Sequence, residues 1–158
     1  MSAREQVCYI LRGIPGSGKS YWCRSFAGKH LETVTVSADD FFMVDGEYKF
    51  SPYRIGEAHA DCMARFLKAT RAGNNIIVDN TNIHNWEWKN YATIAHHCGY
   101  KVIVIEIPVN DLDELKLCIS RNTHSVPADV ISRMAIEFEP TPSTTQWEVV
   151  RQISGIYY

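Results

Sequence analysis

A glycine-rich stretch near the start of the chain has the composition of a phosphate-binding loop. Residues 13–20, GIPGSGKS, place Gly13, Gly18, Lys19 and Ser20 in the pattern G-x-x-x-x-G-K-[ST]. Glycines let such a loop turn its amide N–H groups toward phosphate oxygens, and a following helix adds the positive end of its dipole. The pattern therefore predicts that this loop binds the phosphates of a nucleotide.

The residues of the loop have separate expected roles, with ATP and Mg²⁺ as the cofactors. Lys19 is expected to bridge the β- and γ-phosphates, and the hydroxyl of Ser20 is expected to be a ligand of Mg²⁺. The predicted nucleotide-binding set is the loop with one later arginine: Gly13, Pro15, Gly16, Ser17, Gly18, Lys19, Ser20, Tyr21 and Arg121. The alternative is a glycine-rich turn without a ligand, which the strand pattern before the loop and the helix pattern after it disfavour.

Acidic side chains follow two of the apolar runs in the chain. Asp79 ends the run NIIVD, and Asp39 and Asp40 follow the run TVTV. Because ligands of open α/β sheets bind at the carboxyl ends of the strands, we expect these carboxylates in one crevice. Asp79 is predicted to hold Mg²⁺ directly or through water, and Asp39 to accept a proton from an attacking hydroxyl. An ordinary N-cap or turn role for residues 39–40 is the alternative.

The segment SRNTHSVPADV, residues 120–130, has the features of a lid over the nucleotide. It supplies Arg121 and His124, and Pro127 interrupts it before the next helical pattern. Arg121 is predicted to hold the γ-phosphate in the transition state, where developing charge makes a cation effective. The alternative is that Arg121 is a cation at a helix C-terminus, where the helix dipole favours positive charge.

Aromatic residues gather in residues 41–50, close to Asp39. Rings beside a lysine suit stacking and backbone contact with a single-stranded acceptor, and the alternative is that they cover the core beneath a long loop. These residues are Phe41, Phe42, Tyr48, Lys49 and Phe50. Trp86 lies off the apolar stripe of its helix, so it is either a stacking residue or a partly exposed ring. The predicted acceptor-binding set is Asp39, Asp40, Phe42, Asn82 and Trp86.

Apolar runs and helical patterns alternate along the chain and must position these side chains. The patterns predict strands at 7–11, 33–37, 75–79, 100–107 and 147–153, helices at 19–29, 52–71, 84–97, 111–121 and 127–138, and a loop at 41–50. Strands without polar alternation must be covered on both faces, which is typical of parallel sheets wrapped by helices. We therefore predict an α/β fold with a doubly wound parallel sheet of about four to five strands, of the P-loop NTPase or kinase type, with a helical lid.

Composition limits the size and the partners of the protein. A chain of 158 residues with 46% hydrophobic residues is expected to form a single P-loop kinase domain over 1–158, with the weakest pattern in 139–158. A net charge of −2 means that a nucleic acid would be held by a local groove. Five scattered cysteines without a CxxC pair favour a reducing, cytoplasmic location, and the short apolar runs predict no membrane contact.

Four motifs of the chain resemble the P-loop polynucleotide 5′-hydroxyl kinases, of the T-even phage and bacterial end-healing type. They are GIPGSGKSYWCRSF, SADDF, VDNTN and RNTHSVPADVISRM, and they span roughly residues 7–138. The resemblance implies transfer of the ATP γ-phosphate to the 5′-hydroxyl of RNA or DNA, with Asp39 as general base and Arg121 as lid arginine. It also implies a single-stranded or end-frayed nucleic acid acceptor, and a phosphatase or ligase as a separate partner.

Two positions depart from the pattern of these kinases. Phe42 stands where the end-healing kinases carry an arginine that grips the acceptor phosphate, and Tyr21 stands where threonine is usual. A nucleoside or small-molecule kinase of the same fold is therefore an alternative function. A third interpretation is an ATP-binding interaction module with little catalysis.

Overall fold

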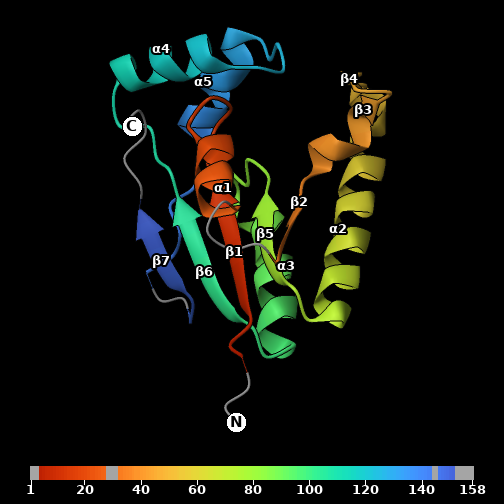
Figure 1. The fold of residues 1–158 in the computed structure, drawn as a ribbon. Helices are drawn as coiled ribbons and strands as arrows, with labels where there is room; N and C mark the ends of the chain where they lie inside the picture. Colours follow the sequence, from red (N-terminus) through yellow and green to blue (C-terminus); the bar gives the residue numbers. More distant parts are fainter. Residues whose placement is uncertain (1–3, 28–31, 144–145, 152–158) are drawn as a thin grey trace.

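A parallel β-sheet forms the centre of the molecule (Figure 1). In the computed structural model, which describes residues 4–27, 32–143 and 146–151, five strands pair in the order β2-β5-β1-β6-β7. Each neighbouring pair is parallel. The strands are Val7–Arg12 (β1), Thr33–Val36 (β2), Asn75–Asp79 (β5), Lys101–Glu106 (β6) and Glu148–Arg151 (β7). The predicted doubly wound α/β fold is confirmed.

Helices follow the strands close to the predicted positions. They are Lys19–Ala27 (α1), Ile55–Ala72 (α2), Asn85–His97 (α3), Leu112–Arg121 (α4) and Ala128–Glu137 (α5). Gly73 ends α2 with a φ of 74°, and the Asp111 side chain caps α4 by accepting a hydrogen bond from the amide of Glu114. The predicted helix end at Lys29 and strand end at Ile153 lie outside the described residues. Within those residues, no helix has the length and apolar character to cross a membrane.

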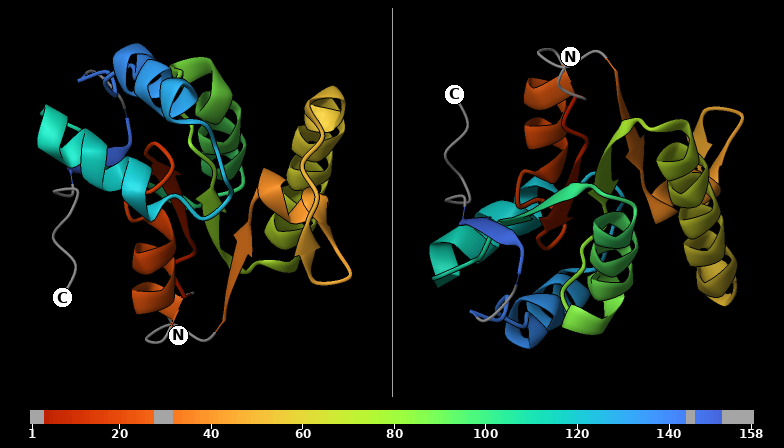
Figure 2. Two further views of the ribbon diagram at one scale, coloured as in Figure 1. Left: turned by 90° about the horizontal axis from the view of Figure 1, so that it is seen from above. Right: turned by 90° about the horizontal axis from the view of Figure 1, so that it is seen from below.

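The two faces of the sheet are covered by different helices, as Figure 2 shows. Successive side chains of a strand point to opposite faces. In β1, Cys8 and Ile10 are fully buried in the cluster shared with α2 and α3. Tyr9 and Leu11 instead face α1, where the Tyr9 ring lies 5.5 Å from that of Trp22. The alternation anchors helices on both sides of the strand that leads into the glycine loop.

Helices α4 and α5 lie across the carboxyl end of the sheet rather than against either face (Figure 1). A small apolar cluster joins them to the glycine loop: Ile14 of the loop, Cys118 of α4 and Ile131 of α5 are all buried there. Residues 120–130, in which a lid is expected, span the end of α4, the connection and the start of α5.

The segment predicted as a loop at 41–50 is more regular than expected. A short 3₁₀ helix, Ala38–Phe42 (η1), leads into a two-stranded hairpin of Met43–Val44 (β3) and Glu47–Tyr48 (β4). The turn residues Asp45 and Gly46 have φ values of 51° and 80°, which suit the tight turn that Asp-Gly favours. A second 3₁₀ turn, Pro52–Arg54 (η2), then leads into α2.

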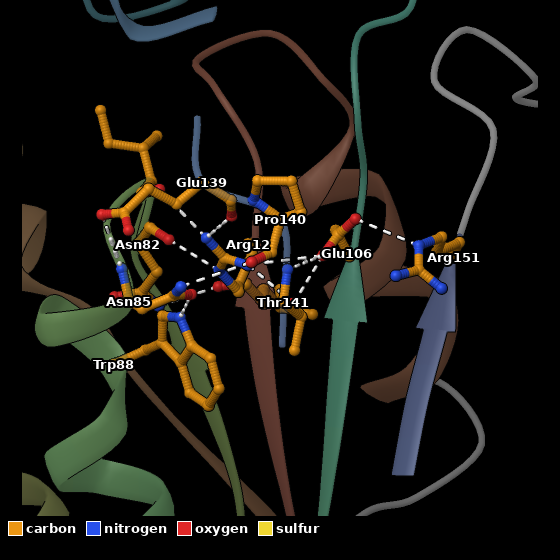
Figure 3. Close-up of polar contacts among 11 residues, drawn as sticks. Arg12, Asn82, Asn85, Trp88, Glu106, Glu139, Pro140, Thr141 and Arg151 are labelled. Carbon is orange, nitrogen blue, oxygen red and sulfur yellow. Dashed lines mark hydrogen bonds and ion pairs between the residues drawn. The ribbon is translucent and has the colours of Figure 1, made fainter. Parts of the chain in front are cut away.

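A buried arginine joins the strand before the glycine loop to the C-terminal part of the chain (Figure 3). Arg12, the last residue of β1, has no exposed surface. Its guanidinium donates hydrogen bonds to the carbonyl oxygens of Asn82 (2.8 Å), Ile83 (3.0 Å) and Glu139 (2.6 Å) and to the hydroxyl of Thr141 (2.7 Å), and pairs with Glu106 at 3.4 Å. Burial lowers the pKa of Arg12 to about 10, so the group is still charged at neutral pH.

Candidate active site

The glycine loop lies between the carboxyl end of β1 and the start of α1. Gly16 and Gly18 have φ values of 79° and 111°, which residues with a side chain rarely adopt. A Cβ on Gly16 would lie 2.0 Å from the carbonyl oxygen of Cys118, so the loop packs directly against the backbone of α4. The amide of Gly13 donates to the carbonyl oxygen of Thr81 at 2.9 Å, which ties the loop to the segment after β5.

The interior of the loop contains a polar group without a protein partner. The Ser17 hydroxyl is buried and has no hydrogen-bond partner among the residues that the structure describes. A Cβ on Gly13 would come within 2.5 Å of that hydroxyl, so only glycine leaves room there. A buried hydroxyl in a narrow cradle of amides fits a loop whose hydrogen bonds are completed by phosphate oxygens. Ser20 is exposed and lies in the first turn of α1, directly after the loop.

Lys19 reaches back across the loop. Its Nζ donates hydrogen bonds to the carbonyl oxygens of Gly13 at 2.8 Å and Ile14 at 3.1 Å. Burial lowers the pKa of Lys19, and the charges of Asp79 and Asp39 oppose that shift. Lys19 begins α1 after β1, Asp79 ends β5 and Asp39 follows β2, so the three residues lie at the carboxyl ends of three neighbouring strands.

Asp79 ends β5 beside Leu11 of β1, its register partner. Burial raises the pKa of the Cys23 thiol on α1, and the charge of Asp79 raises it further. Burial raises the pKa of Asp79, and the positive charge of Lys19 counteracts part of that effect. A carboxylate at this depth, next to an ammonium and the first turn of α1, has the chemistry of a magnesium ligand beside a nucleotide.

Asp39 and Asp40 point toward different partners although they are adjacent in η1. The carboxylate of Asp39 accepts a hydrogen bond from the Tyr48 hydroxyl at 3.2 Å and lies 3.4 Å from Nδ1 of His124. The carboxylate of Asp40 instead pairs with Arg65 of α2 at 3.1 Å. Asp39 therefore faces the lid and the loop, whereas Asp40 is held by the helix behind it.

Two residues that sequence reasoning missed hold η1 in place. Arg65 donates to the carbonyl oxygen of Ser37 at 2.6 Å, as well as to Asp40 and Asp61. Asn80, directly after β5, accepts a hydrogen bond from the amide of Ala38 at 2.8 Å. Asp61 and Arg65 are four residues apart on a helix, and this spacing indicates an ion pair on the helix surface. Nothing in the sequence therefore predicted that Arg65 also contacts η1.

The remaining predicted acceptor residues lie in different environments. Phe42 is only 5% exposed and packs with the rings of Tyr48 and Phe50 at centroid distances of 6.1 Å and 5.1 Å. Asn82 is 1% exposed, and its amide donates to the carbonyl oxygen of Leu11 at 2.8 Å. Trp86 is 73% exposed and lies over His84. The placement favours a packing role for Phe42 and a backbone-bracing role for Asn82.

The residues predicted for a lid lie at the end of α4 and in the connection from α4 to α5. Arg121 is the last residue of α4, and its charge and that of Lys19 both act on the buried thiol of Cys118. Three residues of the connection separate His124 from the start of α5 at Ala128, and the His124 ring stacks on Tyr48 at 4.1 Å. Tyr21 is half-buried on α1.

The chain matches a known protein family and is similar in sequence to several known proteins. A family model described as an AAA domain matches residues 9–141. Human NEDD4-binding protein 2 is 35% identical over 134 residues, which are 84% of this chain and 8% of that protein. L-seryl-tRNA(Sec) kinase of Methanococcus maripaludis is 26% identical over 147 residues, 89% of this chain and 55% of that enzyme. The chain thus spans less than two thirds of the length of either relative.

Solved structures share the fold at low sequence identity. A chain of the Pnkp1/Rnl/Hen1 RNA repair complex matches with a TM-score of 0.64 at 20% identity, covering 87% of this chain and 45% of that one. Kti12 of Chaetomium thermophilum in complex with ADP-AlF3 matches at 0.65 and 13% identity, covering 92% and 88%. A gluconokinase from Sinorhizobium meliloti 1021 matches at 0.59 and 12% identity, covering 94% and 84%. At these identities the likeness shows a P-loop kinase fold.

Proposed function

The chain belongs to the AAA domain family AAA_33, and from that premise we propose that it is an ATP-dependent polynucleotide 5′-hydroxyl kinase. The reaction transfers the γ-phosphate of ATP to the 5′-hydroxyl end of RNA or DNA. The observation that carries the proposal is that Lys19, Asp79 and Asp39 follow or end the three neighbouring strands β1, β5 and β2 at the carboxyl edge of the sheet. This arrangement combines a phosphate cradle, a metal-binding carboxylate and a base in one crevice.

Each residue has a role that follows from its position. The amides of the glycine loop and Lys19 would bind the β- and γ-phosphates, and Ser20 and Asp79 would hold Mg²⁺, which neutralises charge on those phosphates when bound. Asp39 would take the proton of the acceptor hydroxyl as its oxygen attacks the γ-phosphorus. The bond from that phosphorus to the β-phosphate oxygen breaks, and ADP leaves. Arg121, at the end of α4, would contribute positive charge to the transferring group.

The surroundings of Asp39 support a nucleic acid acceptor. Phe50 and Tyr53, on the same segment, are 53% and 97% exposed, and the Arg54 guanidinium lies over the ring of Phe41 at 4.6 Å. Exposed rings and cations together suit the stacking and backbone contacts of a single strand. The similar chain in the RNA repair complex is found together with Rnl and Hen1, which supports a separate partner for further end-processing steps.

A small-molecule kinase is the second candidate function. The observation in its favour is the burial of Phe42, which leaves the position of the acceptor-gripping arginine without a cation. The likeness in fold to a gluconokinase agrees with such a reaction.

An acceptor panel separates the two candidates. The purified protein is incubated with Mg²⁺ and ATP labelled at the γ-phosphate, together with a 5′-hydroxyl oligonucleotide, the same oligonucleotide already phosphorylated, a nucleoside or a sugar. We expect label on the 5′-hydroxyl oligonucleotide and none on its 5′-phosphorylated control. Label on the nucleoside or the sugar alone would replace the proposal with the second candidate.

A further inference from the structure

Side chains of the β3–β4 hairpin and of the connection between α4 and α5 meet at the carboxylate of Asp39. Tyr48 of β4 donates a hydrogen bond to one carboxylate oxygen at 3.2 Å, and Nδ1 of His124 lies 3.4 Å from the other. The rings of Tyr48 and His124 stack on one another at 4.1 Å between centroids, with their planes 14° apart. The two oxygens of the Asp39 carboxylate thus have separate partners, and the rings of these partners hold each other in place by stacking.

The tyrosine of this group is a fixed hydrogen-bond donor. Burial raises the pKa of Tyr48, and the charge of Asp39 and their hydrogen bond raise it further, so the phenol is protonated at any pH at which the protein works. Its ring is held on the other side by Phe50, which lies nearly parallel at 6.4 Å, and by Phe42. The hydroxyl is therefore presented to Asp39 from a packed aromatic cluster rather than from a free side chain.

The histidine comes from the lid, in a turn that the lid itself stabilises. The Asn122 side chain accepts a hydrogen bond from the amide of His124 at 3.2 Å and donates one to the carbonyl oxygen of Val126 at 2.7 Å. Ser125 adopts a φ of 54°, which completes the turn. His124 follows Arg121 by three residues, so the contact with Asp39 also sets where the end of α4 lies.

We propose that Tyr48 and His124 are positioning residues that hold the carboxylate of Asp39 toward the acceptor hydroxyl and couple its orientation to the seating of the lid. The inference rests on the proposed phosphoryl transfer and adds a requirement to it. The Tyr48 hydroxyl occupies one lone pair of the carboxylate and Nδ1 of His124 approaches the other oxygen, which leaves lone pairs free to accept the acceptor's proton. A base held in this way is aligned only when the lid, with Arg121, is in place.

Steady-state kinetics of four variants test the proposal on the acceptor that the unaltered protein phosphorylates. His124→Ala and His124→Phe should lower kcat by about 10- to 100-fold with little change in KM for ATP, although phenylalanine keeps the stacked ring. His124→Asn should stay within about threefold of the unaltered protein, because its amide N–H can occupy the place of Nδ1. Tyr48→Phe should lower kcat about tenfold, since it removes only the hydroxyl that donates to Asp39.

Matched variants control for the substitutions themselves. His97→Ala removes an exposed histidine at the end of α3, and Tyr9→Phe removes a hydroxyl from a tyrosine of β1 whose ring packs against Trp22 and Phe26 of α1. Both should leave kcat unchanged. Full kcat in His124→Phe, or an equal loss in His124→Asn and His124→Ala, would show that only packing matters and would overturn the proposal.

A spectroscopic measurement keeps this test separate from that of the proposed function. In the intact protein, Asp39→Asn should shift the imidazole ¹⁵N resonances of His124 and leave those of His97 in place. Unchanged His124 resonances would disprove the contact even if the protein phosphorylates oligonucleotides. Shifted resonances in a protein that labels no acceptor would instead sustain the contact and reject the kinase reaction.

Discussion

Replacement of Arg12 by methionine should destabilise the protein strongly, because the arginine is the buried link between β1 and the C-terminal segment (Figure 3). Its guanidinium lies between the rings of Trp88 and Phe138, at 5.3 Å and 4.6 Å from their centroids. It also satisfies carbonyl oxygens of three other residues and pairs with Glu106, which is only 4% exposed. Methionine fills part of the volume and replaces none of these hydrogen bonds.

The expected loss in the free energy of unfolding follows from the buried acceptors that Arg12→Met leaves without a donor. Removing one partner of a buried ion pair costs about 3–5 kcal/mol, and each buried acceptor that loses its donor costs about 1–3 kcal/mol, although such terms do not add fully. In Arg12→Met the carboxylate of Glu106 still accepts hydrogen bonds from the amide and hydroxyl of Thr141 and from Arg151, so it is not left without a donor. We therefore expect a loss of about 4 kcal/mol in the free energy of unfolding. In a domain of this size that corresponds to a fall in Tm of about 8–16 °C.

Thermal and denaturant unfolding followed by circular dichroism measure the effect. The matched control is Arg71→Met, which removes an exposed arginine from the last turn of α2 and should change the free energy of unfolding by about 0.5 kcal/mol or less. Arg12→Lys should fall between the two, because an ammonium has three donors and cannot reach all the acceptors of a guanidinium. Equal stability of Arg12→Met and Arg71→Met would refute the reasoning.

Three further predictions concern the loop and the acceptor. Lys19→Met should lower kcat by about 10²- to 10³-fold while the circular dichroism spectrum is unchanged, since the ammonium acts on the nucleotide; a misfolded variant would contradict that role. Gly16→Ala should weaken ATP binding and lower Tm, because its Cβ would meet the Cys118 carbonyl oxygen at 2.0 Å; normal calorimetric affinity would argue against the described loop geometry. Phosphorylation of an oligonucleotide should slow as salt rises, whereas a salt-independent rate would favour a neutral acceptor.

The sequence predicted the elements whose signals are local. The apolar runs located the strands of the sheet, and the helical patterns located the helices close to their observed bounds. The spacing within the glycine loop and the acidic residues after β2 and β5 predicted which side chains converge, because parallel strands place their carboxyl ends at one edge. The hairpin β3–β4 was missed although its Asp-Gly turn was visible, since strands of two residues carry too little pattern.

Contacts between distant segments could not be read from the sequence. The choice between Asp39 and Asp40 depends on Arg65, which lies 25 residues beyond Asp40 along the chain. Likewise, the stacking of His124 on Tyr48 depends on how the lid is seated over the hairpin. No periodicity encodes such pairs, because each is set by tertiary packing.

Label transfer from ATP by Asp39→Asn and Asp40→Asn, side by side with the unaltered protein, tests the central claim most directly. The assay is a time course of label on a 5′-hydroxyl oligonucleotide at saturating ATP and Mg²⁺. We expect transfer by the unaltered protein, a rate within about threefold of it for Asp40→Asn, and a rate about 10²- to 10⁴-fold lower for Asp39→Asn. Equal rates for the two variants would contradict the assignment of Asp39 as the base.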